Sequence, residues 1–457
     1  MKKREIIEGV IKDYDFPNKG SFELDGKKVI VKGALPGQKV SCMVSKVRKD
    51  KAEARLLDVL ERSEIEDAVP PCPQFGICGG CAYQTMSYEH QLELKAGQVK
   101  KLLDGVIDSE AHPYEWEGII GSPVTTAYRN KMEYSFGDEY KDGPLVLGLH
   151  KKNSMYDIVP VCNCVIVSED YNRIVSYTME FARAHGLSYH KKMQHVGLLR
   201  HLVLRQSKTN GGLLINLVTS TDGLENLDLN AYVEGLLALP LDGTVVGTAN
   251  DSLADAVVPE KVTLLYGRDY IEEEVLGLHF QISPFSFFQT NTKSAERLYS
   301  KAREYAGDTK DKLIFDLYSG TGTIAQMLSP VASKVIGVEI VEEAVEAARE
   351  NAKSNGLDNC EFIAGDVLKV IDTIEEKPDL IILDPPRDGI NPKALLKIIN
   401  YGVGEIVYIS CKPTSLARDL VTLQEHGYYV KKACAVDQFV NTGHVETCVL
   451  LTRTSEA

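Results

Sequence analysis

The sequence contains no apolar run long enough to cross a membrane, since a spanning helix needs about 20 consecutive apolar residues. Its first residues, MKKREIIEGVIKDYDF, hold basic side chains with no apolar segment behind them, so they do not form a secretory signal. Tryptophan occurs once, and ten cysteines in 457 residues are too few for a disulfide scaffold. We therefore expect a cytoplasmic protein without a membrane partner, whose cysteines serve as thiols, metal ligands or nucleophiles.

The composition is that of an ordinary folded protein. Hydrophobic residues make up 44% and charged residues 25% of the chain, which excludes a disordered or collagen-like protein. The length favours several domains. The formal net charge is −14, yet residues 1–60 carry 14 Lys and Arg against 9 Asp and Glu. This basic surplus indicates where a nucleic acid would bind, although a solvated lysine surface explains the count equally well.

Residues 1–62 have the pattern of a small β domain. Turn signals such as FPNKG and LPGQK separate five short segments, namely EIIEGVI, GSFELDG, KKVIVKGAL, QKVSCMVSKVRK and KAEARLLDVL. Five strands in this length predict an OB-type barrel, a fold that often binds nucleic acid through a basic face.

The remaining chain divides near residue 275, so that the whole is predicted to be a multidomain α/β protein. Residues 63–275 contain a Cys-rich segment, a helical pattern from Ser87 and mostly alternating strands, which predicts a central α+β domain. Residues 276–457 alternate apolar strands with helical stretches, which predicts a doubly wound, Rossmann-like domain. Its strands are KLIFDLY, KVIGVEI, CEFIAGD, DLIILDPP and EIVYISC.

Acidic residues end three of these strands. In LIFDLYSGTGTI, Asp316 precedes a glycine loop, where the backbone can approach a ligand without a collision at Cβ. Glu339 ends the next strand, from which a carboxylate can accept hydrogen bonds from ribose hydroxyls, and Asp366 is placed to meet an adenine amine. A solvated carboxylate is the alternative for any one acid. Together, the spacing resembles the S-adenosylmethionine site of class I methyltransferases.

Two further strand ends carry candidate reactive groups. Asp384 begins DPPRDG, in which Arg387 replaces the aromatic residue that amino-group methyltransferases have, and this argues against N-methylation. Cys411 ends the fifth strand at the cofactor-binding edge, so its thiol can act as a nucleophile. An inert, buried thiol is the alternative.

The combination of DPPRDG and IVYISCKPTSLARD closely resembles the signature of the RNA uracil-5-methyltransferase family. A second family signature corresponds to VDQFVNTGHVE, in which Val440 and Asn441 replace the usual Pro and His or Gln, so the conformation of this loop is left open. The resemblance implies C5-methylation of uridine. Cys411 would be the nucleophile that adds to C6, and Glu446 the base that removes the C5 proton.

The resemblance also assigns binding roles. Phe287 would stack on the extruded base, with core packing as an equal alternative for Phe287 and Phe288. The cofactor would be S-adenosyl-L-methionine, and the residues implied to bind it are Gln289, Tyr318, Thr323, Glu339, Asp366 and Asp384.

Cys72, Cys78 and Cys81 are spaced C-x5-C-x2-C, which fits neither zinc ribbons nor radical enzymes. Three thiolates need a fourth to complete a four-cysteine iron–sulfur site. A subgroup of the family with an N-terminal TRAM barrel carries this run and a distant fourth cysteine, which implies a [4Fe-4S] cluster with Cys164 as the fourth ligand. Cys162 is a local competitor, and zinc or unligated thiols are the alternatives.

The resemblance covers nearly the whole chain. Because transfer-RNA members of the family generally lack both barrel and cluster, it implies bacterial 23S ribosomal RNA as the partner, bound by a monomer. The alternatives are the same reaction on transfer RNA and a non-catalytic iron–sulfur protein that binds RNA. The sequence leaves open which uridine is methylated.

Overall fold

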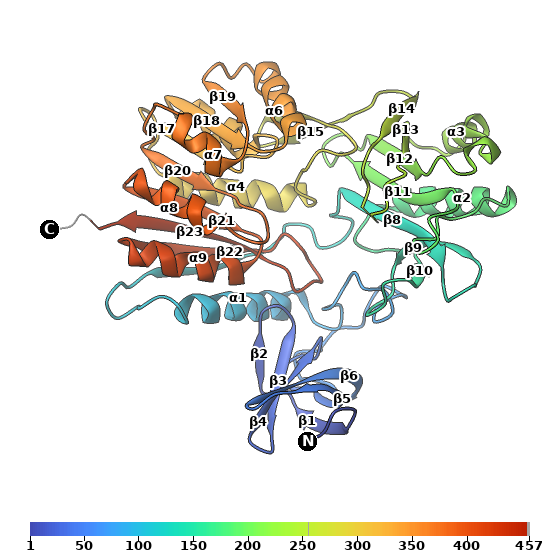
Figure 1. Ribbon diagram of the computed structural model, residues 1–457, viewed down its shortest axis with the longest axis horizontal. Coiled ribbons are helices and arrows are strands. Elements are labelled where there is room, and N and C mark those ends of the chain that lie inside the picture. The colour runs from blue at the N-terminus through green and yellow to red at the C-terminus, as the bar shows by residue number, and fades with distance from the viewer. Residues whose placement is uncertain (255, 455–457) are drawn as a thin grey trace.

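The computed structural model describes residues 1–254 and 256–454. Within these residues the chain forms three large β-sheets and one hairpin, with helices packed against them (Figure 1). No helix in these two ranges combines the length and the apolar composition that crossing a membrane requires.

The N-terminal sheet has six strands in the order β1-β5-β6-β4-β3-β2. They are β1 (Ile6–Val10), β2 (Asp13–Asp15), β3 (Lys19–Leu24), β4 (Lys27–Lys32), β5 (Lys39–Val47) and β6 (Lys51–Glu61). All five predicted strands are present, and the short β2 is an addition. Alternate side chains are buried along β4 and β5, as expected for a sheet with one apolar face. The described residues show no pairing between the edge strands β1 and β2, so a barrel stays a prediction.

The central sheet has seven strands in the order β10-β9-β8-β11-β12-β13-β14. They are β8 (Lys131–Asp138), β9 (Leu145–His150), β10 (Ile158–Pro160), β11 (Leu199–Gln206), β12 (Leu213–Thr219), β13 (Gly243–Ala249) and β14 (Lys261–Tyr266). Helices α2 (Glu169–Ala184) and α3 (Leu229–Leu237) pack against it, with η1 (Leu224–Asn226) between β12 and α3. A hairpin of β15 (Ile271–Val275) and β16 (Leu278–Ile282) then leads to the third sheet.

The third sheet has eight strands in the order β19-β18-β17-β20-β21-β23-β22-β7. They are β7 (Glu115–Ile120), β17 (Leu313–Leu317), β18 (Lys334–Glu339), β19 (Cys360–Ala364), β20 (Leu380–Leu383), β21 (Glu405–Ser410), β22 (Tyr428–Val436) and β23 (Glu446–Arg453). The five predicted strands, β17 to β21, pair in parallel, and β23 is antiparallel to its neighbours. This arrangement is the Rossmann-like fold of methyltransferases, as predicted.

Both faces of this sheet are covered, which explains its continuous apolar strands. Along β17, Ile314 faces one buried apolar cluster and Phe315 the other. The covering helices are α1 (Tyr88–Asp104), α4 (Thr292–Ala306), α5 (Thr323–Leu328), α6 (Glu342–Ser354), α7 (Val367–Val370), α8 (Pro392–Asn400) and α9 (Pro413–Glu425), with the short turns η2 (Ser329–Val331) and η3 (Ile371–Thr373).

Strand β7 joins this sheet from outside the predicted range 276–457. It pairs in parallel with β22 at the sheet edge, and α1 packs beside it against α9 (Figure 1). The ranges 1–62, 63–275 and 276–457 stay predictions as domains, but the last sheet takes one strand and one covering helix from the middle range.

We expect Leu380→Ala to lower the free energy of unfolding by about 3 kcal/mol, because the side chain is fully buried in the central strand β20 and its loss leaves a cavity. The control Leu396→Ala, on the exposed side of α8, should cost less than about 1 kcal/mol. Urea denaturation of both variants checks this, and equal losses would contradict it.

Candidate active site

A cavity of about 1600 Å³ lies at the edge of the sheet where the parallel strands end. Strand ends meet there because β17 to β21 run in the same direction, so residues far apart in sequence converge. The cavity is lined by every residue predicted to be catalytic, to bind the cofactor or to stack on the base, which are Phe287, Gln289, Tyr318, Thr323, Glu339, Asp366, Asp384, Cys411 and Glu446.

The glycine loop after β17 forms one wall. Tyr318, Gly320 and Gly322 all have positive φ angles, of 68°, 54° and 71°. A Cβ atom on Gly322 would lie 2.5 Å from the ring of Phe362, so only glycine fits at that position. Thr323 follows as the first residue of α5. The loop is thereby held close to the cavity, with its backbone free to approach a ligand.

The carboxylate of Glu339 connects this loop to the end of β18. Its Oε2 accepts a hydrogen bond from the amide of Gly320 (3.0 Å), and its Oε1 accepts one from Val341 (2.9 Å). Asp366 caps α7 and accepts a hydrogen bond from Leu368 (3.0 Å). An ionised carboxylate has about four acceptor sites, so both groups keep capacity for hydroxyl or amine donors in the cavity.

Asp316 lies beneath the loop, and it is not among the cavity-lining residues. Its Oδ2 accepts a hydrogen bond from the amide of Ala325 (2.9 Å) at the first turn of α5. Burial, together with the nearby Asp384, raises the pKa of Asp316 to about 8. This strand-end acid therefore positions the loop and helix, and does not itself face the ligand.

The two predicted catalytic residues stand on neighbouring strands. Cys411 directly follows β21 and Glu446 begins β23. These strands are antiparallel, and their register pairs Ser410 with Thr447, which sets Cys411 opposite Glu446. Asp384 follows β20 on the other side of β21. The thiol and both carboxyl groups therefore meet at one end of the cavity.

Burial favours the protonated forms of these three groups. It raises the pKa of Asp384 to about 7 and, with the charge of Asp384, raises that of Glu446 well above its ordinary value. Burial, Glu446 and Asp384 raise the pKa of the Cys411 thiol to about 12, while a hydrogen bond and the charge of Arg387 oppose this. A cationic ligand in the cavity would shift all three groups toward their ionised forms.

The segment 283–291 contributes an aromatic side chain to the cavity wall, and its two phenylalanines lie in different environments. Phe287 lines the cavity with 67% of its surface exposed, whereas Phe288 is buried beside Phe280 in the apolar core. The buried guanidinium of Arg205 donates to the carbonyls of Pro284 and Ser286 and so fixes the chain before Phe287.

The cavity is also lined by residues for which sequence analysis assigned no role, including Arg129, Tyr270, Tyr299, Arg387 and Phe439. Arg129 lies in the motif YRNKMEY and Phe439 in VDQFVNTGHVE. Neither residue type nor spacing indicates that these side chains face the cavity.

The loop before Glu446 accommodates both departures from the family pattern. Asn441 has a φ of 65°, a conformation that asparagine adopts more readily than most residues. Val440 is buried in the core of the central sheet, and its carbonyl accepts a hydrogen bond from the hydroxyl of Tyr128 (2.9 Å).

The four cysteines predicted to hold a cluster are electrostatic neighbours. Burial, with smaller contributions from Cys164, Cys78 and Cys72, raises the pKa of Cys81 to about 12. Cys164 is buried, whereas Cys162 is exposed. In the part of the chain that the structure describes, no three His, Cys, Asp or Glu side chains lie as a group that could hold a metal ion. The [4Fe-4S] cluster therefore stays a prediction.

Comparisons with known proteins identify RNA methyltransferases that are similar to this chain. A family model described as tRNA (Uracil-5-)-methyltransferase matches residues 257–454. An RNA methyltransferase of Clostridium acetobutylicum is 50% identical over 457 residues, and one of Caldanaerobacter subterraneus is 49% identical over 456 residues. Each alignment covers 99% of both chains.

The fold also matches a solved structure over its full length. The tRNA (uracil-54, C5)-methyltransferase of Pyrococcus abyssi, in complex with S-adenosyl-L-homocysteine, aligns with a TM-score of 0.75 and 26% identity. The alignment covers 98% of this chain and 100% of the other. The chain is an S-adenosylmethionine-dependent RNA methyltransferase and belongs to the RNA (uracil-5-)-methyltransferase family.

Proposed function

We propose that this enzyme methylates C5 of uridine in RNA through a covalent adduct between Cys411 and C6 of the base. The observation that carries the proposal is the placement of Cys411 opposite Glu446, beside the glycine loop and in one cavity. A nucleophile, a base and a cofactor-binding loop are the groups that this reaction needs.

The residues of the glycine-loop end fit S-adenosylmethionine, which supplies an electrophilic methyl group on a cationic sulfur. Glu339 would accept hydrogen bonds from the ribose hydroxyls, and Asp366 one from the adenine amine. The carboxyl groups near Cys411 would stabilise the sulfonium charge. The residues proposed to bind the cofactor are Gln289, Tyr318, Thr323, Glu339, Asp366 and Asp384.

At the Cys411 end of the cavity, the thiolate of Cys411 adds to C6 of uracil, and the displaced electron pair makes C5 an enolate carbon. C5 takes the methyl group from the sulfonium, whose S–CH3 electron pair stays on the sulfur of the leaving S-adenosyl-L-homocysteine. Glu446 then accepts the proton from C5. The electron pair of that C–H bond restores the C5–C6 double bond as the C6–S bond breaks, which returns Cys411 as a thiolate. Phe287 would stack on the extruded base, consistent with its exposed ring.

The first candidate substrate is 23S ribosomal RNA, bound in part by a TRAM-like domain of residues 1–62. Its support is the resemblance to the family's subgroup with the cysteine run, together with the basic surplus of the N-terminal segment. One observation favours transfer RNA. The Pyrococcus abyssi enzyme modifies uracil 54 of tRNA, and it aligns with 98% of this chain. The presence of an N-terminal sheet therefore does not by itself distinguish the two substrates.

Incubation of purified enzyme with methyl-labelled cofactor and either 23S ribosomal RNA or transfer RNA, followed by nucleoside analysis, tests the function. We expect 5-methyluridine in the ribosomal RNA. Cys411→Ala should produce none, while it binds the cofactor as the wild type does, because the glycine loop is untouched. Label in transfer RNA alone would reassign the substrate. Turnover by Cys411→Ala would overturn the covalent mechanism.

Glu446→Gln should permit addition and methyl transfer but block elimination, because an amide does not accept the C5 proton. A protein–RNA adduct that survives denaturation should accumulate and should be visible as a shifted band on a denaturing gel. Glu425→Gln, at an exposed position on α9 outside the cavity, is the matched control and should leave no adduct. If Glu446→Gln turns over normally, another group is the base.

For the cysteines, we propose that Cys72, Cys78, Cys81 and Cys164 hold a [4Fe-4S] cluster. The support is their mutual electrostatic proximity and the chemistry of four thiolates, which suits iron–sulfur binding. Protein purified without oxygen should contain about four irons and matching sulfide per chain. Cys164→Ser should lose them, and Cys162→Ser should not. Zinc in place of iron, or the reverse effect of the two variants, would refute this ligand set.

A further inference from the structure

A nine-residue loop connects β22 to β23 and ends directly before Glu446. It comprises residues 437–445, and we call it the base loop. Its Phe439 lines the cavity, and the ring of Phe439 meets that of His444 edge-on at a centroid distance of 6.1 Å. The loop therefore contributes an apolar face to the cavity beside Glu446.

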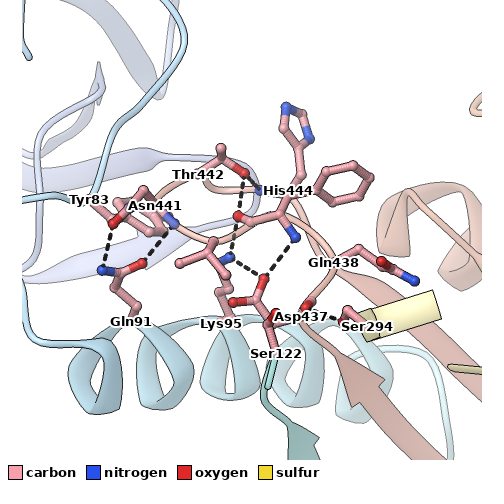
Figure 2. Close-up of polar contacts among 12 residues, drawn as sticks. Tyr83, Gln91, Lys95, Ser122, Ser294, Asp437, Gln438, Asn441, Thr442 and His444 are labelled. Carbon is pink, nitrogen blue, oxygen red and sulfur yellow. Dashed lines mark hydrogen bonds and ion pairs between the residues drawn. The ribbon is translucent and has the colours of Figure 1, made fainter. Parts of the chain in front are cut away.

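The first residue of the loop takes part in a completely buried ion pair. Lys95 of α1 donates from its Nζ to Oδ1 of Asp437 (2.7 Å), and neither side chain is exposed (Figure 2). The hydroxyl of Tyr88 donates to the other carboxylate oxygen of Asp437 (3.0 Å). Ser294 of α4 donates to the backbone carbonyl of Asp437. Asp437 is thus held by residues of two helices, α1 and α4, which lie on different sides of the hairpin formed by β22 and β23.

The backbone carbonyl and the backbone amide of Phe439 both form hydrogen bonds with the residues of this ion pair. The carbonyl of Phe439 accepts a hydrogen bond from Lys95 Nζ (3.0 Å), and its amide donates to Asp437 Oδ1 (3.1 Å). Thr442 donates from its hydroxyl to the same carbonyl (2.8 Å). The backbone on either side of the cavity-lining ring is therefore fixed by Lys95 and Asp437.

The middle of the loop is held by a second group of contacts. Gln91, one turn before Lys95 on α1, exchanges two hydrogen bonds with Asn441 (3.0 and 2.9 Å), as Figure 2 shows. The carbonyl of Asn441 accepts from the amides of Ala82 and Tyr83 (2.8 and 3.1 Å). These contacts hold the left-handed turn at Asn441 but do not touch Phe439.

A buried ion pair is a poor source of stability, because removing two charges from water offsets much of their attraction. In some proteins such pairs instead select one conformation among alternatives. Here the conformation selected is that of the peptide groups around Phe439, which lines the cavity used by the reaction.

We infer that Lys95 and Asp437 are positioning residues that hold Phe439 in the cavity for contact with the RNA base. This inference rests on the proposed function, since it assigns Phe439 to the wall that receives the extruded uracil. Neither Lys95 nor Asp437 lines the cavity, so both act through the base loop. Phe439 contributes an apolar surface, which suits the face or edge of a planar base.

The test compares Lys95→Met, Asp437→Asn and the double variant in steady-state methylation of an RNA that the wild type modifies. Each single variant should lower kcat/KM for RNA by at least about tenfold, because small misplacements of contact groups cost this much. The Kd for S-adenosylmethionine should stay within about twofold. The double variant should lose no more than the worse single variant, because the pair acts as one unit.

Lys301→Met is the matched control. Lys301 forms a partly buried ion pair with Glu117 (3.1 Å) that joins α4 to β7, so its loss perturbs helix-to-sheet packing without touching the base loop. Its kcat/KM for RNA should stay within about twofold of the wild type. An equal loss of kcat/KM in this control would mean that general destabilisation explains the effect, and would overturn the inference.

Phe439→Ala keeps the test decisive if Lys95→Met does not fold. This variant retains the ion pair and both peptide groups, and it should reproduce the loss in kcat/KM for RNA with an unchanged Kd for S-adenosylmethionine. Normal kcat/KM in Phe439→Ala, or in a folded Lys95→Met, would overturn this inference and leave the proposed function standing. If the wild type forms no 5-methyluridine in any RNA, the proposed function itself fails.

Discussion

The buried ion pair between Lys95 and Asp437 is the contact through which the middle segment of the chain enters the methyltransferase site. Lys95 lies on α1, which packs against the sheet edge at β7 and against α9. Six residues further along the same helix, Lys101 reaches the N-terminal sheet, where its Nζ contacts Asp13 and Asp15 (2.6 Å each). A single helix therefore connects the N-terminal sheet, the base loop and the catalytic sheet. The exposed pairs of Lys101 contribute little energy, whereas the buried pair demands precise geometry.

The second constraint is the parallel direction of β17 to β21, which places successive strand ends around one cavity. It brings Asp384 near Cys411, and the antiparallel strand β23 sets Glu446 opposite Cys411. Burial raises the pKa of all three groups. Under the proposed mechanism a sulfonium ligand would favour the ionised carboxylates and the thiolate of Cys411, because of its positive charge. Arg387 already opposes the increase at Cys411 and Glu446.

Much of this could be predicted from sequence, for an identifiable reason. The strands of the catalytic sheet are continuous apolar segments, and Glu339 or Cys411 follow such segments directly, so position along the chain fixes position in space. Strand β7 lacks that advantage, because its partner β22 lies about 300 residues away and the sequence EWEGII carries no distinctive period. The burial of Lys95 could not be predicted from the sequence either. Its helix is polar overall, and the partner that makes burial tolerable lies 342 positions further along the chain.

The same reasoning explains how a cysteine cluster outside the cavity would bear on catalysis. The chain leaves Cys81 and, in its next two residues, donates two backbone hydrogen bonds to the carbonyl of Asn441. The ring of Tyr83 also faces the ammonium group of Lys95, whose Nζ lies 5.9 Å from the ring centroid. A cluster bound by the proposed ligands would hold the segment that ends at Cys81 against the base loop through these contacts.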